Sequence, residues 1–190
     1  MDIRINRYIP VTSVEGPGKR FCIWVQGCSM HCKGCANKHM WNKSGGKIFD
    51  VEDIVSLIRQ YSDEIEGVTF LGGEPLEQIS AVCYIAKKIK EMNLTVVFFT
   101  GNKYTDIIDN KDVQELCKYV DILIDGKYEQ EKADYSRPWV GSKNQKFYFL
   151  SNAYDESVLS NYKNNVEIRI ENGKIIMSGM GDFSGLAAIK

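Results

Sequence analysis

Three cysteines crowd into one short segment, and they are the group in this sequence best suited to chemistry. They are Cys28, Cys32 and Cys35, in the spacing Cys-x3-Cys-x2-Cys. Clustered thiolates bind metals or iron–sulfur clusters in reducing compartments, where structural disulfides are rare. A four-iron cluster that only carries electrons uses four cysteine ligands. Three ligands leave one iron open to a substrate or cofactor, so this spacing favours catalysis over electron transfer.

Two other kinds of site stay open at this point. A structural zinc site needs a fourth tight ligand, which would be His31, His39 or Cys22. His31 lies between two of the clustered cysteines and is badly placed to join them on one metal, whereas His39 is better placed. The other is a non-enzymatic iron–sulfur carrier or sensor. A ferredoxin-type carrier would usually show a fourth nearby cysteine followed by proline, and no Cys-Pro occurs in the sequence.

The remaining cysteines stand singly in apolar segments, at Cys22, Cys83 and Cys117. Free cysteine is among the most buried residue types and packs as a small apolar side chain. We therefore expect these three cysteines to belong to the core. They are also too isolated to hold a second cluster.

The elements that must position the cysteine loop predict an α/β domain. Apolar β-prone runs predict strands, and apolar residues at helical spacing predict helices. The expected strands are 21–25, 67–71, 94–99, 120–124 and 147–150, and the expected helices are one capped by Asp50, one over 79–89 and one over 113–119. This alternation implies parallel strands joined by right-handed crossovers, so the loops at the strand C-terminal ends gather on one face.

That face would carry the cysteine loop together with three further turns. They are Gly72-Gly73-Glu74-Pro75, Thr100-Gly101 and Asp125-Gly126. Open sheets and barrels of this class bind their ligands at this face. Asp125 is equally well explained as the acidic half of an ordinary Asp-Gly turn.

The C-terminal part of the sequence is less regular. Residues 127–146 are polar and long for a connection, so this segment is either mobile or functional. Two β-prone runs, 166–170 and 174–177, flank Glu171-Asn172-Gly173, which predicts a hairpin. We expect a single domain over 1–190, with a core at about 15–150 and a C-terminal extension over 151–190 that contains the hairpin.

Charge and hydropathy limit the partners. The chain has 24 Lys and Arg against 25 Asp and Glu, so no basic field favours nucleic acid. No stretch approaches the roughly 18 apolar residues of a membrane span, and the N-terminus lacks a signal-peptide core. We expect a cytoplasmic protein that binds neither nucleic acid nor a membrane.

The cysteine spacing after a first strand, followed by Gly-Gly-Glu-Pro after a second, resembles the radical S-adenosylmethionine superfamily. The resemblance implies an incomplete parallel (β/α) barrel and a 4Fe-4S cluster on Cys28, Cys32 and Cys35, with S-adenosylmethionine on the open iron. It implies reductive cleavage of S-adenosylmethionine to a 5′-deoxyadenosyl radical, which abstracts hydrogen from a substrate. It implies no catalytic side chain beyond the cluster ligands.

The same resemblance implies a set of residues around S-adenosylmethionine. They lie in the loops at the strand ends: Gly34, Ala36, Gly72, Gly73, Glu74, Thr100 and Asp125. The two residues of the cysteine loop would border the adenosyl group, and the two at the later strand ends would lie near the ribose or carboxylate. The Gly-Gly-Glu turn would hold the methionine amino group, because glycines let backbone approach a ligand and an ammonium group needs acceptors.

Further stretches resemble the activating proteins of anaerobic ribonucleotide reductase, which install a glycyl radical on a partner enzyme. These stretches are Val14–Arg20, Cys35–Lys38 with Trp41, Thr100-Gly101, Val120–Gly126 and Gly141–Gln145. The resemblance implies a glycyl radical enzyme such as this reductase as partner, and a flavodoxin or ferredoxin-type electron donor. Radical enzymes that modify a peptide or small molecule share the same core and stay an alternative.

Two further segments lie outside the predicted cofactor site. Gly141–Gln145, with Arg137 and Trp139 before it, is our candidate for the partner-facing surface. The segment from Lys174 onward, including Met177–Phe183, lies outside the resemblance.

Overall fold

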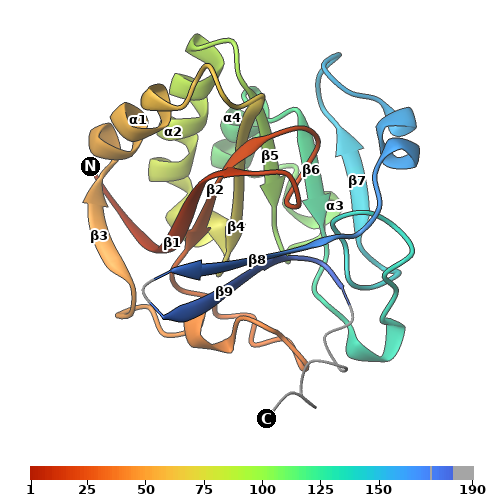
Figure 1. Ribbon diagram of the computed structural model, residues 1–190. Helices are drawn as coiled ribbons and strands as arrows, with labels where there is room; N and C mark the ends of the chain where they lie inside the picture. The colour runs from red at the N-terminus through yellow and green to blue at the C-terminus, as the bar shows by residue number, and fades with distance from the viewer. Residues whose placement is uncertain (172, 182–190) are drawn as a thin grey trace.

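The computed structural model describes residues 1–171 and 173–181, which form one seven-stranded sheet, a separate two-stranded hairpin and several helices (Figure 1). The strands are β1 (Asp2–Thr12), β2 (Arg20–Val25), β3 (Lys47–Asp50), β4 (Gly67–Gly72), β5 (Thr95–Phe99), β6 (Ile122–Asp125), β7 (Lys146–Phe149), β8 (Val166–Glu171) and β9 (Lys174–Gly179). The α-helices are α1 (Val51–Gln60), α2 (Ile79–Glu91), α3 (Tyr104–Ile107) and α4 (Lys111–Cys117), and single 3-10 turns cover Lys38–Met40, Pro75–Gln78, Gln130–Lys132 and Glu156–Asn161.

The strand order of the large sheet is β3-β1-β2-β4-β5-β6-β7. Strands β2, β4, β5 and β6 are parallel neighbours, as the alternation of elements predicts. Antiparallel strands extend both edges, β1 and β3 on one side and β7 on the other. In the described residues β3 and β7 are the two ends of the strand order, and the incomplete barrel stays a prediction.

Strands β1 and β3 and the short helix α3 are not among the elements that the sequence predicts. In β1 the buried residues Ile3 and Ile5 alternate with polar ones, which is the signal of a strand with one covered face. Strand β3 is four residues long and mostly exposed, so it has almost no apolar pattern. It pairs with β1 from Asp2 to Ile5, and it leads directly into α1.

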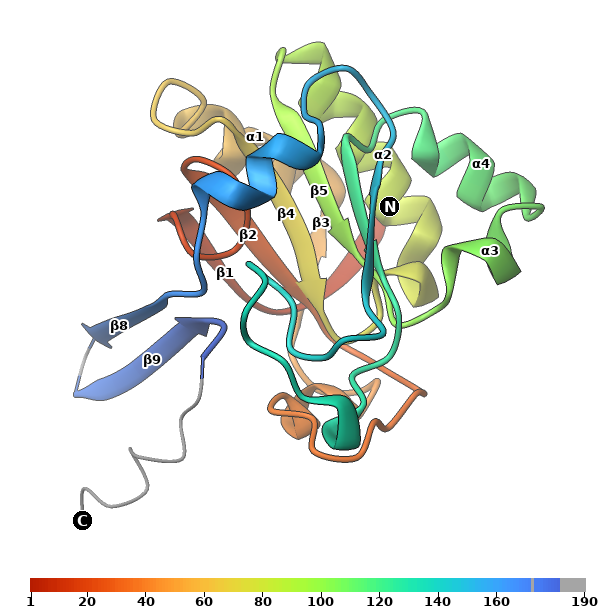
Figure 2. The ribbon, with the colours of Figure 1, turned by 90° about the vertical axis from the view of Figure 1, so that its right-hand side faces the viewer.

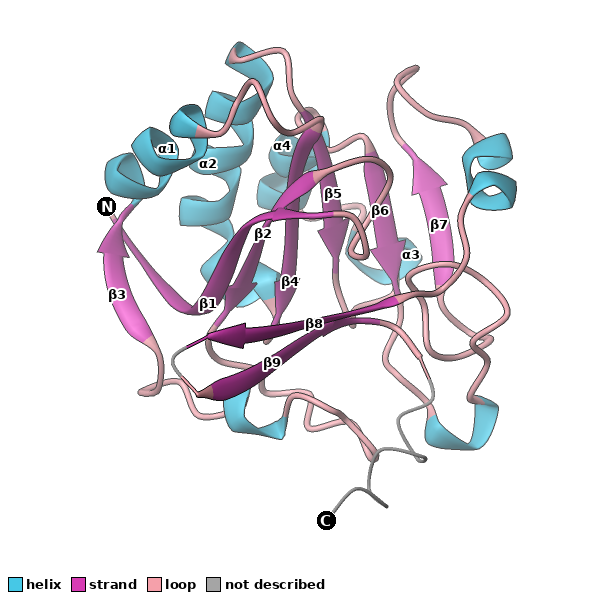
Figure 3. Ribbon diagram, in the orientation of Figure 1, coloured by secondary structure: helices cyan, strands magenta, loops and turns pink. Residues whose placement is uncertain are grey.

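The helices α1, α2 and α4 cover one face of the sheet (Figures 2 and 3). Asp50 caps α1 by accepting a hydrogen bond from the Glu52 N–H at 2.8 Å, as predicted. Buried apolar side chains of α1 and α2 pack on those of β2, β4 and β5 in one continuous core. Because this core fills the helical face, a ligand site must lie at the strand ends or on the opposite face.

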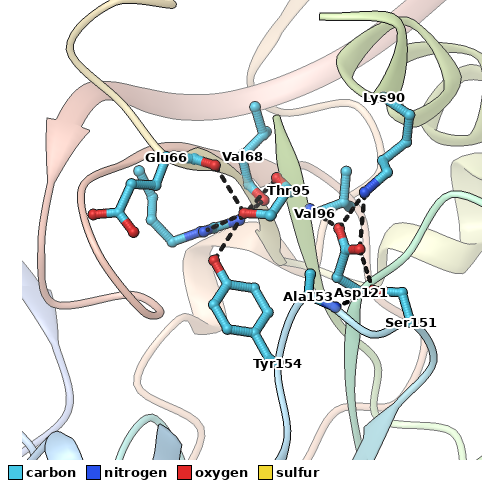
Figure 4. Close-up of polar contacts among 10 residues, drawn as sticks. Glu66, Val68, Lys90, Thr95, Val96, Asp121, Ser151, Ala153 and Tyr154 are labelled. Atoms are coloured by element: carbon cyan, nitrogen blue, oxygen red, sulfur yellow. Dashed lines mark hydrogen bonds and ion pairs between the residues drawn. The ribbon is translucent and has the colours of Figure 1, made fainter. Parts of the chain in front are cut away.

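A buried polar network closes the sheet where the parallel strands begin. Arg20, which has no exposed surface, donates to the carbonyl of Thr95 at 3.0 Å, and the Thr95 hydroxyl hydrogen-bonds Tyr154 at 3.0 Å. Asp121 accepts from the Val96 N–H at 2.7 Å and pairs with Lys90 at 2.8 Å (Figure 4). These groups satisfy one another within the chain, so the opposite, C-terminal ends of the strands remain for function.

The hairpin of β8 and β9 lies on the side of the sheet away from the helices (Figure 2). Its strands pair antiparallel from Val166 opposite Gly179 to Glu171 opposite Lys174, where the Asn-Gly signal predicts a hairpin. Asn172 of that turn, and the Asp182-Phe183 end of the segment outside the resemblance, lie outside the described residues. None of the helices in the described part of the chain has the length and apolarity that crossing a membrane requires.

Candidate active site

The loops at the C-terminal ends of the parallel strands surround a cavity of about 270 Å³. Most of the predicted site residues line it: Cys28, Cys32, Gly34, Cys35, Ala36, Gly72, Gly73, Glu74 and Thr100. They come from three separate stretches of sequence. The fold therefore brings the cysteine loop, the Gly-Gly-Glu-Pro turn and the end of β5 around one space.

The three clustered cysteines are free, partly buried thiols in the wall of this cavity. Burial raises the pKa of the Cys28 thiol, while the backbone N–H groups of Met30 and His31 act in the opposite direction. Burial also raises the pKa of Cys32, and the nearby Cys35 adds to this. The sulfur of Cys35 accepts a hydrogen bond from the Asn37 N–H at 3.4 Å. N–H groups directed at sulfur stabilise thiolates and iron–sulfur clusters.

The cysteine loop is fixed to the Gly-Gly-Glu-Pro turn by hydrogen bonds at its first residues. The Glu74 N–H donates to the Gly27 carbonyl at 2.8 Å, and the Gly27 N–H donates to the Met40 carbonyl at 2.8 Å. One oxygen of Glu77 accepts from both the N–H and the hydroxyl of Ser29, at 2.7 and 2.6 Å. These bonds set the position of the first cysteine relative to the turn after β4.

The two glycines of that turn are required by the chain itself. Gly72 has φ +107, and a Cβ there would lie 2.6 Å from the Cα of Trp24. A Cβ on Gly73 would lie 2.2 Å from the carbonyl oxygen of Gly27. The expectation that these glycines make room for a ligand is thus incomplete, because the backbone that they admit is the segment leading to Cys28.

Glu74 is buried, and its carboxylate joins two of the predicted loops. One oxygen accepts from the Leu76 N–H and the Thr100 hydroxyl, both at 2.9 Å, and the other accepts from the Gly101 N–H at 2.8 Å. Burial raises the pKa of Glu74, and these hydrogen bonds oppose the rise. The second oxygen has acceptor capacity left for a further donor.

Asp125 lies apart from this group. Among the described residues that line the cavity it is absent, while its neighbour Gly126 is present. The buried carboxylate of Asp125 accepts from the backbone N–H of Tyr104 at 2.7 Å and of Lys146 at 3.2 Å. It therefore serves the turn after β6 and the start of β7, which agrees with the alternative of an ordinary turn residue.

The segment predicted to face a partner is an inner wall of the cavity. Trp139, Gly141 and Ser142 are buried, and Trp139, Gly141 and Gln145 line the cavity. The amide oxygen of Gln145 accepts from the Gly141 N–H at 2.9 Å, which folds the segment back on itself. Because apolar Trp139 and Val140 pack in the core, Gly141–Gln145 is part of the cavity wall and not a plain surface loop, and its role toward a partner stays a prediction.

Several residues of the cavity wall are not among the predicted site residues. They include Glu15, Met30, Leu71, Phe99, Tyr128, Met180 and Gly181. Glu15 is buried, and desolvation raises its pKa to about 7. Its carboxylate accepts a hydrogen bond from the Gly179 N–H at 2.6 Å. Such long-range neighbours cannot be found from local patterns.

The other candidate ligands lie elsewhere. Cys22 is buried in the core, as predicted, and Cys83 and Cys117 are partly buried against it. His31 and His39 are exposed, and the His31 ring stacks on Trp41 with a centroid distance of 4.5 Å. In the described residues no three His, Cys, Asp or Glu side chains are grouped to hold one metal ion, and this applies to the three clustered cysteines as well. The grouping therefore does not separate a zinc site from an iron–sulfur site.

Residues 14–148 match the family described as 4Fe-4S single cluster domain. This range contains the cysteine loop, the turn after β4 and the loops after β5 and β6. It ends before the hairpin of β8 and β9.

Curated relatives of known name are similar over most of their length. The anaerobic ribonucleoside-triphosphate reductase-activating protein of Enterobacteria phage T4 is 36% identical over 150 residues, which cover 75% of this chain and 92% of the relative. The protein of the same name from Vibrio cholerae is 33% identical over 147 residues, 74% of this chain and 94% of the relative. The protein of the same name from Escherichia coli K12 is 30% identical over 152 residues, which cover 76% of this chain and 97% of the relative. The chain therefore belongs to the family of anaerobic ribonucleoside-triphosphate reductase-activating proteins and contains a 4Fe-4S single cluster domain.

Proposed function

We propose that this protein is a radical S-adenosylmethionine enzyme that activates an anaerobic ribonucleoside-triphosphate reductase. One observation carries the proposal: the three clustered cysteines and the Gly-Gly-Glu-Pro turn share the wall of one cavity. A cluster-bearing carrier needs only the cysteines. The glycines of the turn pack against the segment leading to Cys28, but the buried carboxylate of Glu74 keeps acceptor capacity for a second ligand beside the cysteines. The proposal includes the incomplete barrel that this superfamily implies.

The residues present suit a 4Fe-4S cluster with one open iron. Cys28, Cys32 and Cys35 offer three thiols, and each would bind a different iron of the cluster. Backbone N–H groups already point at the sulfurs of Cys28 and Cys35. When bound and reduced, the cluster supplies the electron that cleaves S-adenosylmethionine, whose adenosyl fragment takes a hydrogen atom from the substrate.

The rest of the cavity suits S-adenosylmethionine. The whole cavity, cysteine walls included, measures about 270 Å³, just under the lower end, roughly 300 Å³, of ordinary ligand pockets. The turn of Gly72, Gly73 and Glu74 would hold the methionine amino group through acceptors, and Gly34 and Ala36 would border the adenosyl group. Apolar walls at Leu71 and Phe99 exclude water, which protects a reactive fragment from side reactions.

We infer the partner from the names of the relatives. They are reductase-activating proteins, so we propose that the hydrogen donor is a glycine of the corresponding reductase. The electron donor would be a flavodoxin or a ferredoxin-type protein. Within this proposal the chain adds no catalytic side chain beyond the cluster ligands.

The test begins with anaerobic reconstitution of the full chain. We expect about four irons and four sulfides per chain, from the cluster type that the cysteine spacing implies. With dithionite and S-adenosylmethionine the protein should then form 5′-deoxyadenosine, and with the reductase it should produce a doublet glycyl radical signal in electron paramagnetic resonance.

Each alternative gives a different result. Stoichiometric zinc without sulfide would identify a structural metal site. An intact cluster that never yields 5′-deoxyadenosine would identify a carrier or sensor. Formation of 5′-deoxyadenosine only with a peptide or metabolite, and no radical on the reductase, would refute the activating role alone.

A further inference from the structure

The hairpin of β8 and β9 exposes an apolar face. Val166, Ile168, Ile170 and Ile175 are exposed by 38, 53, 76 and 68%, and we call these four residues the outer hairpin face. Ile170 lies directly opposite Ile175 in the register, so the side chains share one face. An antiparallel sheet with one covered face normally turns its apolar side inward and its polar side to water.

Here the polar side faces inward. The hydroxyl of Thr12 donates to Glu167, and the guanidinium of Arg169 donates to the Val11 carbonyl. Arg7 donates to the carbonyl of Met177 at 3.0 Å. Polar groups therefore hold the hairpin on β1. The isoleucines on the opposite side of the hairpin take no part in this contact.

The hairpin continues directly into the candidate active site. The Gly179 N–H donates to Glu15, a residue of the cavity wall, and Met180 and Gly181 line the cavity after it. The sulfur of Met180 lies 3.4 Å from the Cβ position of Gly141 on the facing wall. The edge of the cavity and the outer hairpin face thus belong to one continuous piece of chain.

We propose that the outer hairpin face is the docking surface for the protein that receives the radical, and that it binds an apolar segment flanking the target glycine. This inference rests on the proposed function. A glycine that enters the cavity beside Met180 brings its flanking residues over the hairpin, since β9 leads to that edge. Exposed contiguous apolar patches of this kind mark interaction sites. A second copy of the chain on the same face would stand beside the cavity edge and compete with that approach.

The hairpin lies outside the range that matches the family, which ends at residue 148. The cysteine loop and the turn after β4, by contrast, lie inside it. Docking through the hairpin would therefore be a property of this chain that selects its own reductase, separate from the shared chemistry. Specificity of this kind is set by surface contacts that correct and incorrect partners do not share.

The experiment removes the apolar face while keeping the hairpin. The double variant Ile170→Lys with Ile175→Glu places opposite charges on a cross-strand pair, which preserves pairing. The matched control is Ile108→Lys, because Ile108 is 41% exposed and follows α3 on the far side of the sheet (Figure 2). We measure the Kd for the purified reductase of the same organism and, separately, formation of 5′-deoxyadenosine without it.

The double variant should raise the Kd for the reductase at least about tenfold, and the control should leave it unchanged. Formation of 5′-deoxyadenosine without the reductase should be the same in both variants and the unaltered chain, which shows that they fold. The milder variant Ile168→Thr keeps β-propensity and should raise the Kd about threefold.

An unchanged Kd in the double variant overturns the inference. The inference also fails if the double variant converts a dimer to a monomer without weakening the reductase, because the face would then join two copies. If the Kd rises but no variant or unaltered chain ever forms 5′-deoxyadenosine, the docking surface stands and the proposed chemistry fails.

Discussion

One carboxylate oxygen of Glu77 accepts two hydrogen bonds from Ser29, one from its N–H at 2.7 Å and one from its hydroxyl at 2.6 Å. Ser29 follows the first clustered cysteine, and Glu77 lies in the 3-10 turn after Gly-Gly-Glu-Pro. Lys43 pairs with the other oxygen of Glu77 at 2.9 Å. The pair thus holds the cysteine loop against the turn. Burial raises the pKa of Glu77, but Ser29 and Lys43 together outweigh it, so the pKa is lowered.

Glu77→Ala should therefore loosen the cysteine loop while leaving the core intact. A hydrogen bond to a charged group contributes about 1.5–3 kcal/mol, and partial exposure reduces this, so we expect roughly tenfold faster loss of iron to a chelator. The absorbance of the reconstituted cluster measures the rate. Glu64→Ala is the matched control, since Glu64 is exposed. Equal rates in the two variants would show that Ser29 does not depend on Glu77.

Changing Cys28, Cys32 or Cys35 singly to Ala should abolish cluster retention or catalysis, because each thiol is a separate ligand in the proposed site. Cys83→Ala should cost only packing, since this thiol is partly buried against the core between helices. Iron and sulfide content, with the thermal midpoint as the measure of folding, separates the two results. Loss of iron in folded Cys83→Ala would mean that the ligands are assigned wrongly.

Gly73→Val should disrupt more than binding of S-adenosylmethionine. Its Cβ would lie 2.2 Å from the Gly27 carbonyl oxygen, so the segment leading to Cys28 must move. We expect loss of both the cluster and the change that S-adenosylmethionine causes in its electron paramagnetic resonance signal. Ser56→Val is the control, because Ser56 is exposed on α1. Normal iron content in Gly73→Val would show that the turn does not position the segment leading to Cys28 and serves only to bind a ligand.

Glu15 should make the stability of the protein depend on pH. Burial raises its pKa from 4.5 to about 7, against the opposing influence of the Gly179 N–H and of Arg7, with Glu167 adding to the rise. The folded chain then binds more protons than the unfolded chain between these values, so the free energy of unfolding falls as pH rises from about 4.5 to about 7.

The measurement is urea unfolding at several pH values across that window, for the unaltered chain and for Glu15→Gln. The glutamine keeps an oxygen that can accept from Gly179 but does not ionise. Between these pH values we expect the free energy of unfolding to fall by about 3 kcal/mol less in the variant than in the unaltered chain. That is the free energy that corresponds to a pKa shift of this size. Parallel pH profiles in the two proteins would show that Glu15 ionises normally under the hairpin.

The sequence by itself predicted the alternating core and indicated an iron–sulfur site. Cysteine spacing, the Gly-Gly-Glu-Pro turn and the apolar runs are local patterns, and local patterns specify ligand types, strands such as β4 and helices such as α2. Parallel strands then require their C-terminal loops to share one face, which is why most of the predicted site residues line one cavity. The same reasoning missed β1. It left two roles open for Asp125, because an Asp-Gly turn looks alike in both.

Only the tertiary structure shows the features that depend on contacts between residues far apart in the sequence. No local pattern shows that Glu74 reaches Thr100, that Trp139 draws its loop inward, or that Glu15 meets Gly179 across 164 positions. The outer hairpin face illustrates the same limit. The alternation of Val166–Ile170 predicts a strand with one apolar side, but only the polar contacts with β1 decide that this side faces outward. Side-chain orientation in a paired strand is set by the surface on which it docks, and that surface is assembled by folding.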